Sequence, residues 1–117
     1  MKPIVKKLEN LTPQQYYEKH LSIVHQFLPV QLTNKEIEVL ATFMALQGDV
    51  AELDRFGTQC RKIVMKKLGI VPGGLGNYLR DLISKGYISK VDKTYTINKY
   101  IIPNSKVQGY QFLIEMK

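Results

Sequence analysis

The chain has 117 residues, 44% of them hydrophobic, and carries a formal net charge of +7 with a pI of about 9.5. This length suits one soluble domain with a single core, and no apolar run reaches the roughly 20 residues that a membrane-spanning helix needs. The basic balance favours an acidic partner (nucleic acid, an anionic membrane or an acidic protein surface), although lysines that only solubilise the fold are the alternative. Cys60 is the only cysteine, which excludes an internal disulfide, and no apolar segment of a secretory signal follows the first lysines. We therefore expect a cytoplasmic protein.

The N-terminal part contains a short lysine-bearing segment and a helix. Residues 1–11 form either a basic arm along a nucleic-acid backbone or a partly ordered terminus. A helix is predicted over residues 13–28, because Thr12 and Gln15 match a capping box and Pro13 suits the first helical turn. Its wide apolar face needs a neighbour, which is either the rest of the domain or the same helix of a second copy.

Two histidines lie on this predicted helix. His20 and His25 are five residues apart, which is about 140° around a helix, so they cannot face one metal ion together. No cluster of carboxylates accompanies them. We therefore expect no metal site.

A second helix is predicted to begin at the capping box of Thr33 and Glu36 and to end at Gly48. Its apolar residues fall in two rows, which indicates burial on two sides. Residues 49–56 then form a linking segment that carries three acidic residues: Asp49, Glu52 and Asp54.

The third predicted helix covers residues 58–68, with Thr58 as its cap and Cys60 on its inner side. Lys62 and Lys66 lie at positions i and i+4 on the outer side, where like charges repel by a few tenths of a kcal/mol. A bound anion would relieve that repulsion. This outer face is therefore a candidate phosphate clamp, with an ordinary solvated helix face as the alternative.

The chain is organised around the stretch that follows. Gly69 suits the left-handed end of one helix, and Pro72 suits the first turn of the next. A helix over residues 73–85 ends before Gly86 and buries three residues spaced by three and four: Leu75, Leu79 and Leu82. The positions expected to face outward are Gly73, Gly74, Gly76, Asn77, Arg80, Asp81 and Ser84.

A β-hairpin is predicted after this helix. Residues 87–91 and 94–97 are rich in β-forming residues and flank the polar pair Asp92-Lys93. Asp-Lys is not a preferred two-residue turn, so a longer tip stays open as an alternative. Three polar residues mark the tip as a structure that could reach a groove or a phosphate: Lys90, Lys93 and Thr94.

The C-terminal segment, residues 110–116, is predicted to be a strand, because its apolar residues Tyr110, Phe112, Ile114 and Met116 would line one face. Such a strand either joins the hairpin sheet or docks on another subunit by strand addition. A homodimer could therefore form through this strand or through the helix over residues 13–28.

Residues 32–97 resemble the winged helix-turn-helix domains of the ArsR-like and MarR-like regulators. The features that carry the resemblance are a Leu-Gly-Ile turn at residues 68–70, a leucine-bearing helix after it, and a Lys-Gly-Tyr-Ile entry into the hairpin at residues 85–88. The run from Leu32 to Leu40 is similar to the first helix of these families, which often begins Leu-Thr and carries a Val-Leu pair.

The resemblance implies an α+β, mainly α fold, with an extra N-terminal helix and a C-terminal strand that joins the wing sheet. Residues 1–31 would be the N-terminal arm and helix, and residues 32–117 the winged helix-turn-helix domain, within one compact unit. It also implies a transcriptional regulator that binds double-stranded DNA, with the first helix of the motif across the backbone and the second in the major groove. The implied DNA-binding residues are Arg61, Lys62, Lys66, Gly73, Gly74, Asn77, Arg80, Lys90, Lys93 and Thr94.

The second helix of the motif departs from the family pattern, because three glycines stand where these families carry Ser, Thr, Arg or Gln. Asn77 can read adenine and Arg80 can read guanine, but a glycine has no side chain to read a base. Either the glycines let the helix approach DNA closely, with limited base readout, or this surface packs against protein. In the second case the chain is a winged-helix adaptor in a larger assembly, such as a transcription or replication complex or a phage particle, and would lie in the virion. The acidic residues of segment 49–56 and the apolar segment 110–116 favour that alternative.

The sequence shows no sign of an enzyme. The glycine-rich run at residues 72–76 lacks both the preceding strand and the following Lys-Ser/Thr of a phosphate-binding loop. No set of Ser, His and carboxylate suggests catalytic residues. We expect no cofactor.

Overall fold

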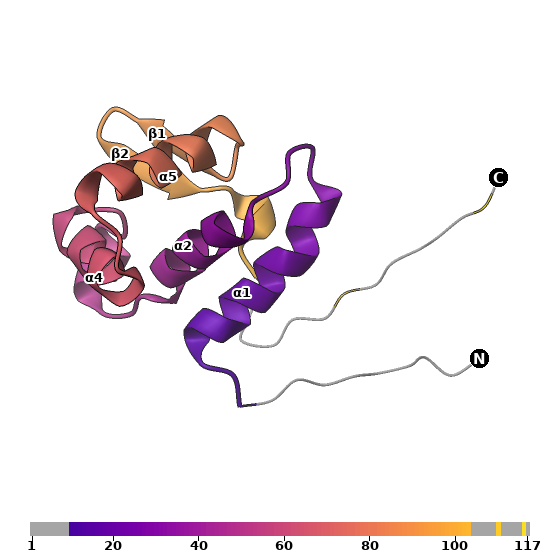
Figure 1. Ribbon diagram of the computed structural model, residues 1–117, viewed down its shortest axis with the longest axis horizontal. Helices are drawn as coiled ribbons and strands as arrows, with labels where there is room; N and C mark the ends of the chain where they lie inside the picture. The colour runs from indigo at the N-terminus through magenta and orange to yellow at the C-terminus, as the bar shows by residue number, and fades with distance from the viewer. Residues whose placement is uncertain (1–9, 104–109, 111–115, 117) are drawn as a thin grey trace.

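The computed structural model describes residues 10–103, Tyr110 and Met116. This part of the chain is α+β and mainly α, as predicted, with a short antiparallel hairpin beside the helices (Figure 1). The elements are α1 (Pro13–Val24), η1 (His25–Phe27), α2 (Asn34–Ala45), α3 (Asp49–Leu53), α4 (Thr58–Leu68), α5 (Pro72–Ser84), β1 (Ile88–Val91), β2 (Thr94–Ile97) and η2 (Lys99–Ile101).

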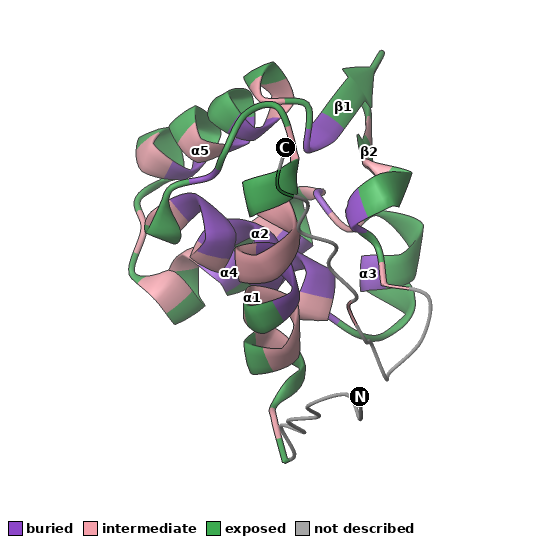
Figure 2. Ribbon diagram, turned by 90° about the vertical axis from the view of Figure 1, so that its right-hand side faces the viewer, coloured by how far each residue is buried: buried purple, intermediate pink, exposed green. Residues whose placement is uncertain are grey.

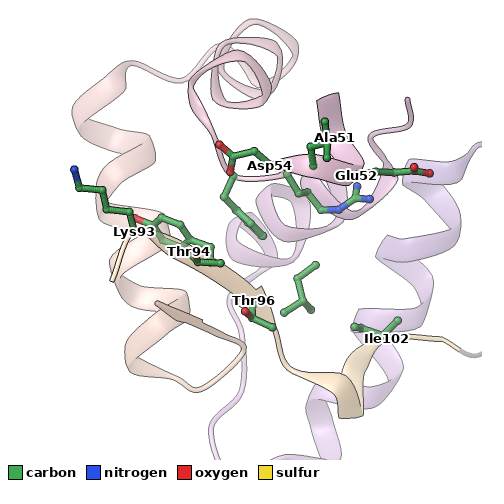
Figure 3. Close-up of a pocket in the computed structure, with 12 residues that line it drawn as sticks. Ala51, Glu52, Asp54, Lys93, Thr94, Thr96 and Ile102 are labelled. Carbon is green, nitrogen blue, oxygen red and sulfur yellow. The ribbon is translucent and has the colours of Figure 1, made fainter. Parts of the chain in front are cut away.

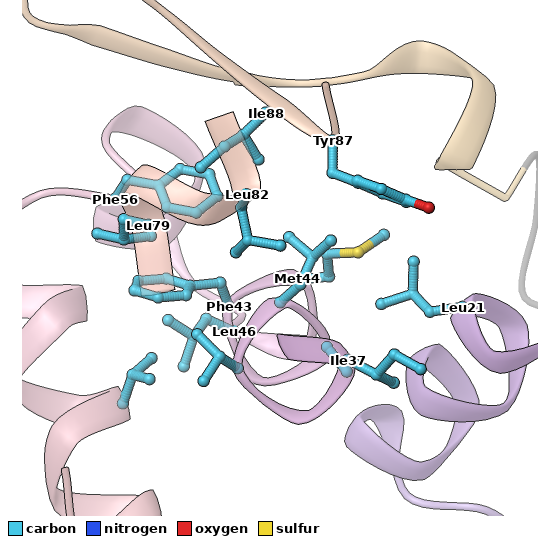
Figure 4. Packing of buried hydrophobic residues seen from close by; sticks show 14 of the residues in the cluster. Leu21, Ile37, Phe43, Met44, Leu46, Phe56, Leu79, Leu82, Tyr87 and Ile88 are labelled. Carbon is cyan, nitrogen blue, oxygen red and sulfur yellow. The ribbon is translucent and has the colours of Figure 1, made fainter. Parts of the chain in front are cut away.

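Helix α2 is the centre of the core. It contacts α1, α4 and α5, and Figure 1 shows it between α1 and the α5–hairpin side. Its two apolar rows are buried, as predicted. The ring centroids of Phe43 and Phe56 lie 4.7 Å apart. Leu79 and Leu82 of α5, with Tyr87 before β1, close the core around this helix (Figure 4).

Both predicted capping boxes are confirmed. The hydroxyl groups of Thr12 and Thr33 each accept a hydrogen bond from the backbone N–H of the residue three positions later. The side-chain oxygens of Gln15 and Glu36 in turn accept from the backbone N–H groups of the two threonines. The prediction that Thr58 caps α4 was wrong, because Gly57 takes the N-cap position with no side-chain cap. A Cβ on Gly57 would overlap Oδ2 of Asp54, so a larger residue there would require the Asp54 carboxylate to move.

The predicted ends of the first two helices were too late. Helix α1 gives way to the 3-10 turn η1 before Pro29, and Nδ1 of His25 accepts the Leu32 N–H at 3.0 Å, which fixes the reversal of the chain. Helix α2 ends at Ala45, and the linking segment after Gly48 contains the short helix α3.

Arg55, which follows α3, donates hydrogen bonds to the C-terminal end of α2. Its Nη1 group donates to three carbonyl groups at the end of that helix, at distances of 2.9, 3.3 and 2.7 Å: those of Phe43, Met44 and Leu46. Carbonyl groups at the end of a helix lack the usual intrahelical partners, and a guanidinium is well placed to donate to them, beside the 3.3 Å bond from the Leu46 N–H to the Phe43 carbonyl.

His20 joins α1 to the C-terminal part of the chain. Its Nε2–H donates to the carbonyl of Ile101 at 2.7 Å, so Nδ1 must accept from the hydroxyl of Tyr110. Burial lowers the pKa of His20, which favours this neutral form, and burial raises the pKa of Tyr110 to about 12. The remaining residues of the predicted arm and of the predicted C-terminal strand lie outside the described residues.

The hairpin has a tight tip. Ile88 pairs with Ile97 and Val91 pairs with Thr94, which leaves Asp92-Lys93 as a two-residue turn. The alternative of a longer tip was therefore wrong. Asp92 has φ of +56°, in the left-handed region that aspartate tolerates better than most residues.

Candidate nucleic-acid interface

A three-residue turn joins α4 to α5. Gly69 ends α4 in the left-handed conformation, at φ of +65°, and the Ile70 N–H donates to the carbonyl of Met65 at 3.0 Å. Val71 is extended, and Pro72 begins α5, where its missing N–H costs nothing. The predicted roles of Gly69 and Pro72 are both confirmed.

Helix α5 has one buried and one exposed face. Leu75, Leu79 and Leu82 are 2%, 2% and 0% exposed, which confirms the predicted inner face. Figure 2 shows the exposed outer side of α5 opposite the core. The exposed residues are Pro72, Gly73, Gly76, Asn77, Arg80, Asp81 and Ser84. Gly74, which was also predicted to face outward, is only partly exposed.

The three glycines of α5 are not equivalent. A Cβ on Gly74 would lie 3.3 Å from Cγ2 of Ile70, so Gly74 packs against the turn of its own chain. A Cβ on Gly73 or Gly76 would meet nothing within 4 Å. Packing inside the described chain therefore accounts for Gly74 and not for the other two.

Replacing Gly76 with alanine should stabilise the protein. Glycine costs a helix interior up to about 1 kcal/mol relative to alanine, and the space for the new methyl group is open. We expect the free energy of unfolding in urea to rise by about 0.5–1 kcal/mol. Gly74→Ala is the matched control, with a smaller gain or a loss because it crowds Ile70. A destabilised Gly76→Ala variant would show that the outer face of α5 is not open.

The charge of the protein is segregated along the chain. Residues 58–103, which we call the basic segment, contain nine Lys and Arg residues and two Asp residues, a net charge of +7. Residues 10–57 contain three basic and six acidic residues, a net charge of −3. The net charge of the segment that holds α4, α5, the hairpin and η2 therefore equals the net charge of the whole protein, +7.

The predicted phosphate contacts on α4 and the hairpin tip are accessible. Lys62 and Lys66 are exposed on α4, and Lys93 and Thr94 are exposed at the tip. Within the described residues, none of these three lysines forms an ion pair with a carboxylate. Their charges are therefore free to meet an anion.

Arg61 and Lys90 meet at one ring. Cζ of Arg61 lies 5.1 Å and Nζ of Lys90 lies 5.3 Å from the centroid of the Tyr95 ring. Burial alone would raise the pKa of Tyr95, but the two cations outweigh it and hold that pKa below its ordinary value. The structure thus brings the first turn of α4 against the hairpin. Arg61 is less available than predicted, because its Nε also donates to the carbonyl of Phe56 at 2.6 Å.

The two predicted base-reading side chains bind each other. Nη2 of Arg80 donates to Oδ1 of Asn77 at 2.7 Å on the exposed face of α5. The sequence had indicated two separate base-reading side chains. Their spacing of three residues on one helix was a signal that they could pair.

A second surface feature was not predicted. A cavity of about 470 Å³ lies between α3, the following residues 54–56 and the strand β2 (Figure 3). Charged residues of both signs line it, among them Glu52, Asp54 and Lys93. Beside it Leu53 is 87% exposed and Ile102 is 47% exposed.

Neither a metal site nor a membrane span is found in the described part of the chain. No group of three or more His, Cys, Asp or Glu side chains could hold a metal ion there. Among the helices described, none combines the length and the apolar character needed to cross a bilayer.

Comparisons with known proteins identify no relative. No protein-family model matches the chain, and no curated protein or solved structure gives a significant match.

Proposed function

We propose that this protein is a small winged-helix DNA-binding protein, a transcriptional regulator that holds duplex DNA through phosphate contacts with limited base readout. The observation that carries the proposal is the concentration of positive charge in the basic segment, around a helix, a three-residue turn, a second helix and a hairpin. Duplex DNA is the polyanion that such an arrangement commonly binds.

Each element has a role in this proposal. Helix α4 lies across the backbone with Lys62 and Lys66 on phosphates, and α5 enters the major groove. The hairpin is the wing, and its exposed Lys93 contacts a neighbouring phosphate. The bare positions Gly73 and Gly76 permit close approach of the α5 backbone to DNA.

A salt titration tests the proposal. Four lysines without a carboxylate partner in the described residues can meet phosphates: Lys62, Lys66, Lys90 and Lys93. Four contacts predict that log K falls with log salt concentration with a slope of about −3.6. Fluorescence anisotropy with a mixed-sequence duplex at several salt concentrations measures this slope. No binding at low salt, or a slope near zero, would rule the proposal out.

A winged-helix adaptor that binds protein is the second candidate. The apolar rim formed by Leu53 and Ile102 beside the cavity of Figure 3 favours it, because such exposed apolar groups are typical of protein interfaces. The same titration separates the two candidates, since the adaptor requires no duplex affinity. The homodimer and the larger assembly stay predictions.

A further inference from the structure

Asn77 and Arg80 present an unusual set of hydrogen-bonding groups. Oδ1 of Asn77 already accepts from Nη2 of Arg80 at 2.7 Å. Within the described residues the remaining N–H groups of both side chains form no other hydrogen bond. Arginine has donors alone, and the one acceptor of the asparagine is engaged. The exposed pair therefore offers mainly donors to whatever approaches α5.

A set of donors distinguishes the purines in the major groove. Guanine presents two acceptors there, N7 and O6, whereas adenine presents the acceptor N7 and the donor N6 amino group. An isolated asparagine reads adenine because its nitrogen donates to N7 while its oxygen accepts from N6. At Asn77 an adenine amino group that approached the second lone pair of Oδ1 would lie beside the guanidinium, donor against donor.

We propose that Asn77 and Arg80 act as one donor unit that selects guanine over adenine, an inference that rests on the proposed DNA-binding function. Arg80 contributes the planar fork that matches N7 and O6 of guanine. Asn77 orients that fork and loses its own preference for adenine while Arg80 occupies Oδ1. The two residues are thus specificity-determining together and not separately.

The surroundings of the pair leave a base edge free to reach it. Gly73 and Gly76, which precede the pair on α5, carry no side chains, and a Cβ at either position would stand in open space. Asn77 and Arg80 are both exposed. The pair is therefore accessible along the bare first half of the helix.

The inference predicts a reversal of base preference. Full-length protein is incubated with a library of randomised duplexes, and the bound fraction is sequenced. Wild-type protein should enrich guanine at one position by roughly 5- to 150-fold, the discrimination of a good paired contact. Arg80→Ala frees Oδ1 of Asn77 and should shift the preference at that position to adenine. Arg80→Lys keeps the charge but lacks the fork, so it should lose most of the guanine enrichment with an unchanged salt slope.

Thermal unfolding of each variant checks the fold, which should be intact because both side chains are exposed. Guanine enrichment that turns to adenine in Arg80→Ala supports the inference. Wild-type binding with no base preference, or with a preference for adenine, overturns it and leaves the proposed function standing. If wild-type protein binds no duplex at any salt concentration, both fall.

Discussion

Reversing the charge of Lys62 and Lys66 together should weaken duplex binding by roughly 50- to 100-fold at 0.1 M salt. Each phosphate contact contributes about 0.9 to the slope of log K against log salt concentration. The binding constant that two contacts supply therefore rises by about 1.8 decades for each tenfold fall in salt, and this is the loss expected at about 0.1 M salt when both contacts are removed. The slope should become shallower by the same amount, about 1.8. Both lysines are exposed on α4, so the variant Lys62→Glu/Lys66→Glu is expected to fold.

The control for this prediction carries the same change in net charge at a different place. Lys19→Glu/Lys35→Glu alters α1 and α2, in the half of the described chain that is already acidic. Lys35 loses an ion pair with Glu38 of 3.3 Å, which is partly exposed and contributes little to stability. Duplex affinity should change by no more than a few-fold. Equal losses in the two variants would mean that net charge alone, and not the α4 face, drives binding.

The local features of the fold were predictable because their signals lie within a few residues. Thr33 and Glu36 cap α2, Gly69 takes the left-handed position, and Leu79 lies on the inner face of α5, all as the spacing indicated. These features depend on hydrogen bonds and sterics between near neighbours, which one sequence records directly.

The features that were missed depend on residues far apart in the chain. Arg55 donates to carbonyl groups at the end of α2 that lie 9 to 12 positions earlier in the chain. The guanidinium of Arg61, on α4, lies over the ring of Tyr95, on β2. Packing in three dimensions selects these contacts, so periodicity and spacing could not reveal them.

The candidate site divides in the same way. The exposed face of α5 followed from the leucine spacing, and the exposure of Lys62 and Lys66 followed from their place on α4. The contacts of Arg61 with the carbonyl of Phe56 and the ring of Tyr95 could not be predicted in this way, because the contact with Tyr95 requires the hairpin to lie against α4.

The second large effect concerns the ion pair between Glu36 and Lys85, 49 residues apart. Nζ of Lys85, at the end of α5, lies 2.5 Å from Oε1 of Glu36, which also accepts the Thr33 N–H at 2.8 Å. The Glu36 side chain is 4% exposed and that of Lys85 is 24% exposed. The pair therefore joins the start of α2 to the end of α5 where water has little access.

Replacing Lys85 with methionine should lower the free energy of unfolding by about 3 kcal/mol at neutral pH. The variant keeps most of the aliphatic stem but leaves the carboxylate of Glu36 buried without its cation, and an unpaired buried charge is costly. Urea denaturation measures the loss. The double variant Glu36→Gln/Lys85→Met should recover most of it, because glutamine keeps the capping role and carries no charge.

The pH dependence distinguishes a lost ion pair from a packing defect. In the wild-type protein burial alone would raise the pKa of Glu36, but Lys85 and Thr33 outweigh it and hold that pKa below its ordinary value. This contribution to stability is present above the unfolded pKa of about 4.3 and is lost as pH falls through the lower folded pKa. In Lys85→Met the lysine no longer opposes burial, so the folded pKa of Glu36 should be higher than in the wild-type protein and less stability should be gained as pH rises. The difference between the two proteins should thus be small in acid and grow towards neutral pH, whereas a deficit that is equal at acid and neutral pH would assign the loss to packing around the lysine stem.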